Sequence, residues 1–97
     1  MAATGGEVRI AWQDGRNGPF RWNTFVRASH DGGRTWQGAV DISDVASGYG
    51  YLHPRGYDAD YGDYMEVAIT SEGTTFAVWG AAFGYAGPGG TWFNVET

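Results

Sequence analysis

Short segments in which polar and apolar residues alternate, separated by glycine-rich turns, occupy most of this sequence. Alternation with a period of two residues is typical of strands with one buried face, and no stretch shows the 3.6-residue period of an amphipathic helix. The seventeen glycines and the five tryptophans, six tyrosines and five phenylalanines also favour strands joined by tight turns. We therefore expect an all-β protein of six strands. They are residues 7–12, 23–29, 36–42, 64–70, 75–81 and 91–96.

The charge and the residue types exclude several classes of function. The chain has a formal net charge of −5 and a pI near 4.6, and all six of its basic residues are arginines. Such a chain lacks the positive surface that binds a nucleic-acid backbone or an anionic membrane, so we expect neither as a partner. The sequence contains no cysteine, which excludes disulfides, thiolate nucleophiles and cysteine-ligated zinc.

The cellular compartment is left open by the sequence. No apolar run approaches the roughly 18 residues of a membrane-spanning helix. Residues 1–6 have neither the charged start nor the apolar run of a signal peptide. Either the protein stays inside the cell or a leader segment is missing from this chain.

The second half of the chain repeats a pattern of the first half. Trp12 and Trp79 lie 67 residues apart, and residues 24–26 align with residues 91–93 at the same spacing without a gap. Each copy has a strand that ends in tryptophan, a glycine-rich turn and a strand of threonine, aromatic and apolar residues. The spacing predicts two related hairpins, with a chance alignment of aromatic hairpins as the alternative.

Residues 29–36, with the sequence SHDGGRTW, have the composition of a hydrogen-bonded hairpin tip. The carboxylate of Asp31 can accept hydrogen bonds from the backbone of the turn. Gly33 can adopt the positive φ that other residues avoid. Trp36 can then fold back and bury its ring against the hairpin. A plain Asp-Gly-Gly hairpin is the alternative interpretation.

The same segment resembles the Asp-box of the BNR repeat, in which a serine or threonine, an aspartate, a glycine, a threonine and a tryptophan recur at this spacing. The resemblance implies a sialidase-like β-propeller in which Ser29, Asp31, Gly33 and Trp36 are structural residues on an outer hairpin, away from the central axis. Residues 11–16 are also similar to strand ends of this group, and residues 62–64 resemble the Gly-Asp-Tyr that opens an inner strand in many of its members. Family resemblance further suggests a secreted protein.

Placed on propeller blades, the predicted strands make about one and a half blades of a single domain. Residues 6–48 would form a first blade with the Asp-box, and residues 62–97 an incomplete second blade. A first inner strand and a last outer strand are missing from this scheme. Because a propeller needs at least four blades, we expect the chain to form a homo-oligomer or to be a piece of a larger protein.

The long connection over residues 43–63 is the most informative candidate for binding. Its tyrosines alternate with glycine and aspartate, and a tyrosine ring can stack on a sugar while its hydroxyl bonds the sugar hydroxyls. The alternative is that these rings cover a blade end or a subunit contact. The candidate ligand-binding residues are Trp12, Arg16, Tyr49, Tyr51, Arg55 and Tyr57.

A catalytic function is the less favoured hypothesis, and we assign no catalytic residue. Sialidases bind the substrate carboxylate with three arginines, and the motif that supplies one of them is absent, because residues 20–23 share only its first two residues. The arginines that could gather on a sugar acid are Arg16, Arg21 and Arg55, although Arg16 is expected to form a local ion pair with Asp14. The carboxylates available for glycoside hydrolysis are Asp14, Asp63 and Glu66.

Calcium is the one cofactor that the sequence suggests, and only weakly. Three aspartates, Asp58, Asp60 and Asp63, lie within six residues, and oxygen-rich loops of this kind can hold Ca²⁺. The pattern lacks the glutamate of an EF-hand, and solvated loop carboxylates are the alternative. His30 and His53 have no second ligand at metal-binding spacing, and His30 is expected to face solvent.

The sequence thus supports three hypotheses. The first is a non-catalytic, carbohydrate-recognising β-propeller module assembled from several copies, with itself and glycans as partners. The second is an inactive fragment of a sialidase-like glycoside hydrolase. The third is a self-associating structural protein without a ligand.

Overall fold

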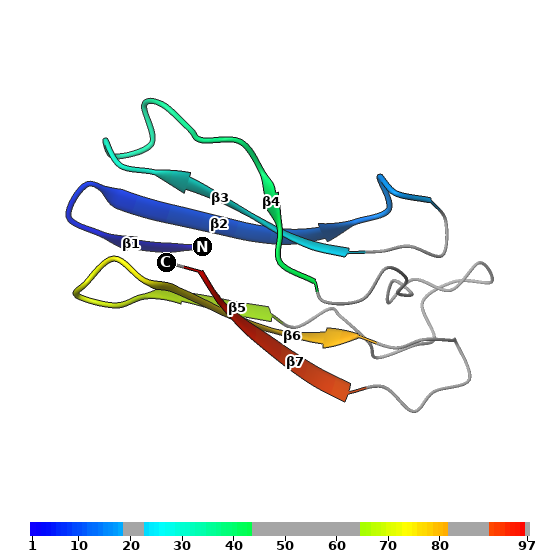
Figure 1. Ribbon diagram of the computed structural model, residues 1–97. Helices are drawn as coiled ribbons and strands as arrows, with labels where there is room; N and C mark the ends of the chain where they lie inside the picture. Colours follow the sequence, from blue (N-terminus) through cyan, green and yellow to red (C-terminus); the bar gives the residue numbers. More distant parts are fainter. Residues whose placement is uncertain (19–22, 44–64, 82–89, 97) are drawn as a thin grey trace.

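The computed structural model describes residues 1–18, 23–43, 65–81 and 90–96. These residues form seven strands in two antiparallel sheets, and no helix occurs among them (Figure 1). The described part therefore also contains no helix of the length and hydrophobicity that a membrane crossing requires. The all-β class predicted from the alternating pattern is confirmed.

Sheet 1 consists of the first four strands in sequence order. They are β1 (Ala2–Thr4), β2 (Glu7–Asp14), β3 (Asn23–Ser29) and β4 (Val40–Asp41). The ladder between β2 and β3 is the longest in this sheet, with Val8 opposite Ser29 at one end and Asp14 opposite Asn23 at the other. Their alternating residues present one face to sheet 2 and the other face outward.

Sheet 2 consists of the remaining three strands, again in sequence order. They are β5 (Met65–Ile69), β6 (Thr75–Ala81) and β7 (Gly90–Glu96). Predicted and observed bounds of β3 and β6 are identical, those of β5 differ by one residue at each end, and those of β7 differ by one residue at its start. β2 continues two residues beyond the predicted segment, to Asp14.

The predicted 67-residue repeat is present in the strand register. In sheet 1, Arg9 lies opposite Ala28 and Trp12 lies opposite Phe25. In sheet 2, the residues 67 positions later pair in the same way, with Phe76 opposite Val95 and Trp79 opposite Trp92. The hairpins β2–β3 and β6–β7 are therefore equivalent units of one repeat. A chance similarity of aromatic strands would not require the two hairpins to share one register.

The expectation that sheet 1 lacks its initial strand is wrong. β1 pairs with β2 through a two-residue turn, because Thr4 lies opposite Glu7 and only Gly5 and Gly6 separate them. Gly5 has a φ of 58°, in the left-handed region that such tight hairpin turns require. The Ala-Ala-Thr sequence of β1 has no apolar alternation, so its strand character comes from pairing alone.

The strand predicted over residues 36–42 is also incorrect, because only Val40 and Asp41 form β4. The backbone N–H of Gln37 donates to the carbonyl of Ala28, whereas Val40 lies opposite Val26. Val40 is three residues after Gln37, whereas Val26 is only two residues before Ala28. The segment therefore contains one residue too many for a continuous ladder with β3. The extra residue interrupts pairing in the manner of a β-bulge.

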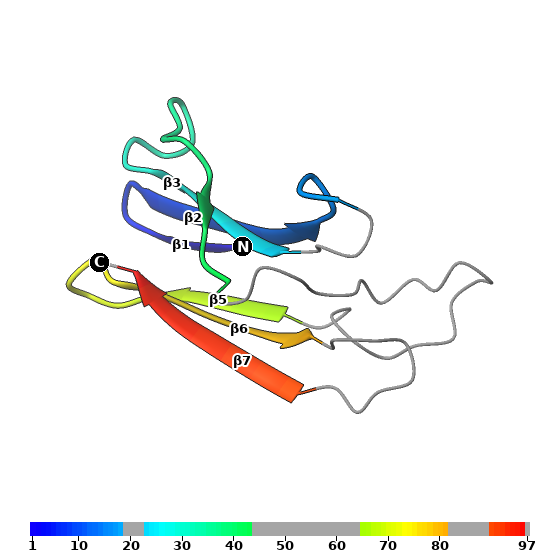
Figure 2. The same ribbon diagram turned by 45° about the vertical axis from the view of Figure 1, so that its right-hand side comes forward.

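The core lies between the two sheets, which form two facing layers (Figure 2). Val26 and Ile42 from sheet 1 pack with Val67, Ala77 and Trp79 from sheet 2, and each is at most 6% exposed. Ala2, Ala11 and Met65 pack around this cluster. Burial of these apolar side chains provides the main stabilisation of the two-layer arrangement.

Polar side chains also join the layers. The Nε atom of Arg9 donates to Thr75 Oγ1 at 2.8 Å, and Gln13 Nε2 donates to the carbonyl of Gly80 at 3.2 Å. From the other sheet, Asn94 Nδ2 donates to the carbonyl of Ile42 at 2.7 Å. These directional contacts fix how one sheet sits on the other, which apolar packing alone does not.

The antiparallel order separates the connections into two groups. Residues 5–6, 30–39 and 70–74 connect strands at one end of the layers, which we call the turn end (Figure 1). The connections β2–β3, β4–β5 and β6–β7 all leave from the opposite end, which we call the connection end. The tyrosine-rich residues 44–63 therefore belong to the connection between β4 and β5 that starts at the same end as Asp14.

Candidate functional site

An aromatic and charged cluster lies at the connection end of sheet 1. The rings of Trp12 and Phe25 are stacked with centroids 6.0 Å apart and an interplanar angle of 25°. The guanidinium of Arg16 lies 4.0 Å from the Phe25 ring centroid and 5.6 Å from that of Trp12. The turn after β2 thus places a cation over two aromatic faces, which is a favourable geometry.

Asp14 holds this arrangement together. Its carboxylate accepts hydrogen bonds from Arg16 Nε and Nη2, the latter at 2.6 Å, and from Trp12 Nε1 at 2.7 Å. The expected local ion pair between Asp14 and Arg16 is therefore confirmed. The hydrogen bonds from Arg16, followed by the one from Trp12, hold the pKa of the Asp14 carboxyl well below its usual range.

The cluster offers an ionised carboxylate and a partly exposed guanidinium beside the partly exposed ring of Trp12, whereas Phe25 is only 5% exposed. Such a surface suits a polar ligand with apolar faces, as a pyranose has. It does not suit general acid catalysis, because a general acid needs a raised pKa and that of Asp14 is lowered. Trp12 and Arg16, which the sequence analysis selected separately as binding residues, are thus brought together by the fold.

At the turn end, residues 29–36 form a compact hairpin tip around Asp31. Its carboxylate accepts from the backbone N–H groups of Arg34 and Thr35 at 2.9 and 2.8 Å and from Thr35 Oγ1 at 2.6 Å. Ser29 Oγ donates to Asp31 at 2.8 Å and accepts from the N–H of Gly33. The expected acceptance of backbone hydrogen bonds by Asp31 is confirmed.

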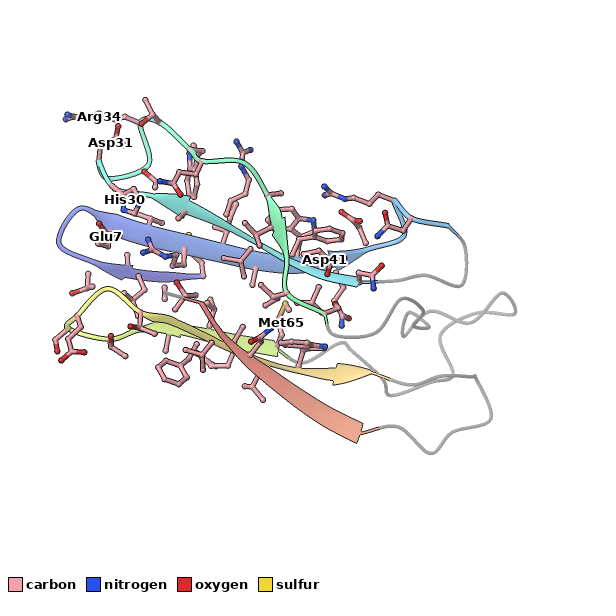
Figure 3. All side chains as sticks on the ribbon, in the orientation of Figure 1. Glu7, His30, Asp31, Arg34, Asp41 and Met65 are labelled. Atoms are coloured by element: carbon pink, nitrogen blue, oxygen red, sulfur yellow. The ribbon has the colours of Figure 1, made fainter. Side chains whose placement is uncertain are left out.

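Gly33 also behaves as expected, and Trp36 folds back as expected but is half-buried rather than buried. Gly33 has a φ of 91°, and the half-buried Trp36 folds back so that its Nε1 donates to the carbonyl of Gly33 at 3.0 Å. Asp31 and Arg34 lie at the far tip of the hairpin (Figure 3). Because these hydrogen bonds are all internal to the loop, the tip is a structural element rather than an open ligand site.

The tip makes a pH-dependent contribution to stability. Its hydrogen bonds, those from Thr35 first, lower the pKa of Asp31 to about 2 from an ordinary value of 3.8. A carboxyl with a lowered folded-state pKa stabilises the fold above its unfolded pKa, and the stabilisation is lost as pH falls toward the folded pKa. We expect the melting temperature to fall between about pH 4 and pH 2, and Asp31→Ala to lower it at neutral pH and flatten this dependence. Thermal melts of Asp31→Ala and of the exposed-carboxylate control Glu72→Ala test this, and identical profiles would contradict it.

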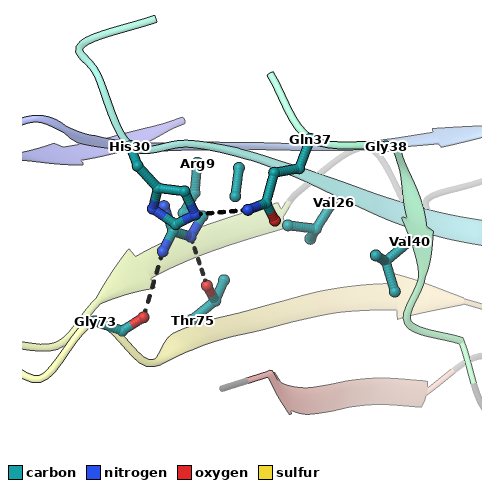
Figure 4. Close-up of a pocket in the computed structure, with 9 residues that line it drawn as sticks. Arg9, Val26, His30, Gln37, Gly38, Val40, Gly73 and Thr75 are labelled. Atoms are coloured by element: carbon teal, nitrogen blue, oxygen red, sulfur yellow. Dashed lines mark hydrogen bonds between the residues drawn. The ribbon is translucent and has the colours of Figure 1, made fainter. Parts of the chain in front are cut away.

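The sequence analysis missed a pocket between the sheets at the turn end (Figure 4). Its volume is about 260 Å³, and Arg9, His30, Gln37 and Thr75 line it together with apolar residues. Arg9 is 4% exposed and forms an ion pair with Glu7 at 2.7 Å. The one sequence feature that points to this pocket is Arg9, a charged residue at the position that Phe76 occupies in the second copy of the repeat.

The charged and polar groups at the pocket contact one another. The carboxylate of Glu7 lies 2.8 Å from His30 Nδ1, and Gln37 Nε2 lies 2.9 Å from His30 Nε2. Contacts with His30 and then with Arg9 lower the pKa of Glu7. His30 is exposed, as expected, but its ring is held between these two partners. The arrangement joins the hairpin tip to β2 and to the β5–β6 turn.

Several predicted site residues lie outside the described residues and stay predictions. They are the binding candidates Tyr49, Tyr51, Arg55 and Tyr57, the calcium candidates Asp58, Asp60 and Asp63, and also Arg21 and His53. Glu66 is exposed on β5, while Asp14 is committed to Arg16 in the other sheet. Within the ranges that the structure describes, no three histidine, aspartate or glutamate side chains gather as a metal site would require.

Comparison of the chain with models of known families, with curated proteins and with solved structures finds no match. The functional assignment therefore rests on the residues and their geometry.

Proposed function

We propose that this chain is a non-catalytic, carbohydrate-recognising module of β-propeller type, built from Asp-box blades and assembled from several copies. Its supports are the two consecutive antiparallel sheets, the repeated hairpin register and the internally bonded tip of residues 29–36. The resemblance of that tip to the Asp-box is the reason for proposing a β-propeller. A propeller offers binding surfaces on connections that a rigid sheet scaffold holds in place.

The single observation that carries the binding proposal is the cluster of Trp12, Arg16 and Phe25 at the connection end. β4 ends toward this same end of sheet 1, and the tyrosine-rich segment follows β4 in the sequence. The partly exposed Trp12 ring beside a guanidinium and a carboxylate supplies both stacking and hydrogen bonding, the two interactions that sugars use, while the buried Phe25 ring packs against Arg16. The low pKa of Asp14 argues against a general-acid role for this carboxyl.

Arg16→Ala is expected to weaken sugar binding about tenfold, since partly exposed arginines over aromatic rings are frequent binding hot spots. The measurement is an NMR titration of the full chain with a panel of neutral hexoses, N-acetylhexosamines and sialic acid. Arg34→Ala is the matched control, because Arg34 lies at the opposite end of the sheet, on the exposed hairpin tip. The proposal fails if no sugar of the panel shifts any resonance of the unmodified chain, or if both variants weaken binding equally.

A further inference from the structure

The outer face of sheet 2 is apolar and exposed. Phe76 is 43% exposed, Val78 37% and Val95 39%, and all three lie on the side that faces away from sheet 1. Ala68 lies beside Phe76 on the neighbouring strand. An outward-facing sheet surface normally carries polar residues, so a contiguous apolar face of this kind marks a contact surface.

The 67-residue repeat indicates what covers this face. The repeat equivalents of Phe76, Val78 and Val95 are Arg9, Ala11 and Ala28 in sheet 1. Those residues lie on the inner face of sheet 1, which packs against sheet 2. The exposed face of sheet 2 is therefore the same face of the repeat that, in sheet 1, is already covered by a following sheet.

The converse holds for the outer face of sheet 1. Ile10 and Arg27 lie opposite each other on that face, and their repeat equivalents in sheet 2 are Ala77 and Asn94. Ala77 is in the core between the sheets, and Asn94 bonds across it to sheet 1. The outer face of sheet 1 is thus the face that, in sheet 2, packs against a preceding sheet.

The outer face of sheet 2 therefore corresponds to the inner face of sheet 1, and the outer face of sheet 1 corresponds to the inner face of sheet 2. These are the two kinds of face that pack together within the chain. We propose that the outer face of sheet 2 in one copy docks on the outer face of sheet 1 in the next copy and repeats the packing within the chain. The inference rests on the proposed assembly from several copies and names the surfaces that perform it.

A contact between two different faces is heterologous, so it extends from copy to copy until a ring closes. Each copy contributes two sheets, and propellers contain about four to eight blades, so roughly two to four copies close a ring. Trp12 is the repeat equivalent of the buried Trp79, so this docking would cover the Trp12 ring, whereas Arg16 lies beyond the end of β2, at the rim of the contact between copies.

The test is the solution mass by light scattering, with one substitution on each face. The unmodified chain is expected to give a multiple of 10.5 kDa. Val78→Glu on sheet 2 and Ile10→Glu on sheet 1 should each block one face in every copy and stop assembly, leaving single chains. Mixed one to one, the two variants should form a dimer, because each keeps the face that the other lacks. Arg34→Glu, at an exposed residue of the hairpin tip that lies on neither docking face, is the control and should assemble normally.

The outcomes separate this inference from the function. A monomeric unmodified chain overturns it, and so does an Ile10→Glu variant that still assembles fully, since that would mean sheet 2 faces pairing with each other. Phe76→Ser replaces Val78→Glu if the latter does not fold, as judged by circular dichroism. If the chain binds sugar but stays monomeric, only the proposed docking between copies is overturned. If it assembles but binds no sugar, only the proposed recognition function is overturned.

Discussion

Replacing Trp79 by alanine is expected to lower the free energy of unfolding by about 3–5 kcal/mol, the usual cost of deleting a buried aromatic side chain. Trp79 is 5% exposed and packs in the core with Val26 and Ile42 of the other sheet. Its removal leaves a cavity between two layers whose separation is fixed by polar contacts elsewhere, so the sheets cannot collapse to fill it. A domain of this size has only about 5–15 kcal/mol of stability, so the variant should be near unfolding.

Urea denaturation followed by circular dichroism measures this effect. Val78→Ala is the control, because Val78 is the preceding residue on β6 but points to the outer face and is 37% exposed. In the single chain its replacement should change the unfolding free energy by about 0.5 kcal/mol or less. Equal losses for the two variants would show that the sheets do not pack through the face of Trp79.

Arg9→Met is expected to cost about 3 kcal/mol, although methionine preserves most of the buried volume. Arg9 is 4% exposed and donates to Thr75 Oγ1 at 2.8 Å, to the carbonyl of Val8 at 3.1 Å and, more weakly, to those of Ser29 and Gly73. Methionine leaves these buried acceptors without their donor, and each such loss costs about 1–3 kcal/mol. The effect is larger than that of a surface ion pair, whose removal costs about 0–1 kcal/mol.

Urea denaturation at low and at high salt concentration tests this second expectation. The loss in Arg9→Met should persist at high salt, because buried contacts are screened far less than exposed ones. Arg34→Met, which removes the same charge from the exposed hairpin tip, should have little effect at either salt concentration. A loss that disappears at high salt would mean that Arg9 acts through long-range charge alone rather than through its buried hydrogen bonds.

The elements that could be predicted are those whose cause is local. The alternation of β3 and β6 predicts both strands with their observed ends, and the spacing of Ser29, Asp31 and Gly33 predicts the bonded tip. The elements that could not be predicted depend on a partner strand. β1 has no pattern of its own and exists because Gly5 and Gly6 allow it to fold back on β2.

The candidate site divides in the same way. The pairing of Asp14 with Arg16 follows from their two-residue separation across a turn and could be predicted. The position of Arg16 over Phe25 could not, because the ring comes from the next strand and its place depends on the β2–β3 register. The pocket around Arg9 was missed because it is formed by both sheets and a hairpin tip, which nothing in the linear order of Arg9, His30 and Thr75 brings together.

The sequence by itself determined the all-β class, the bonding of the hairpin tip and the repeat of 67 residues, since each depends on residues that are neighbours in the chain or follow a fixed spacing. Only the tertiary structure decided which face of each repeat is buried. The same alternating pattern allows either face to point inward, and the choice follows from stacking two sheets in one direction. That stacking covers Trp79, buries Arg9 against Thr75 and leaves Phe76 and Val78 exposed, because one layer can cover only one face of the other.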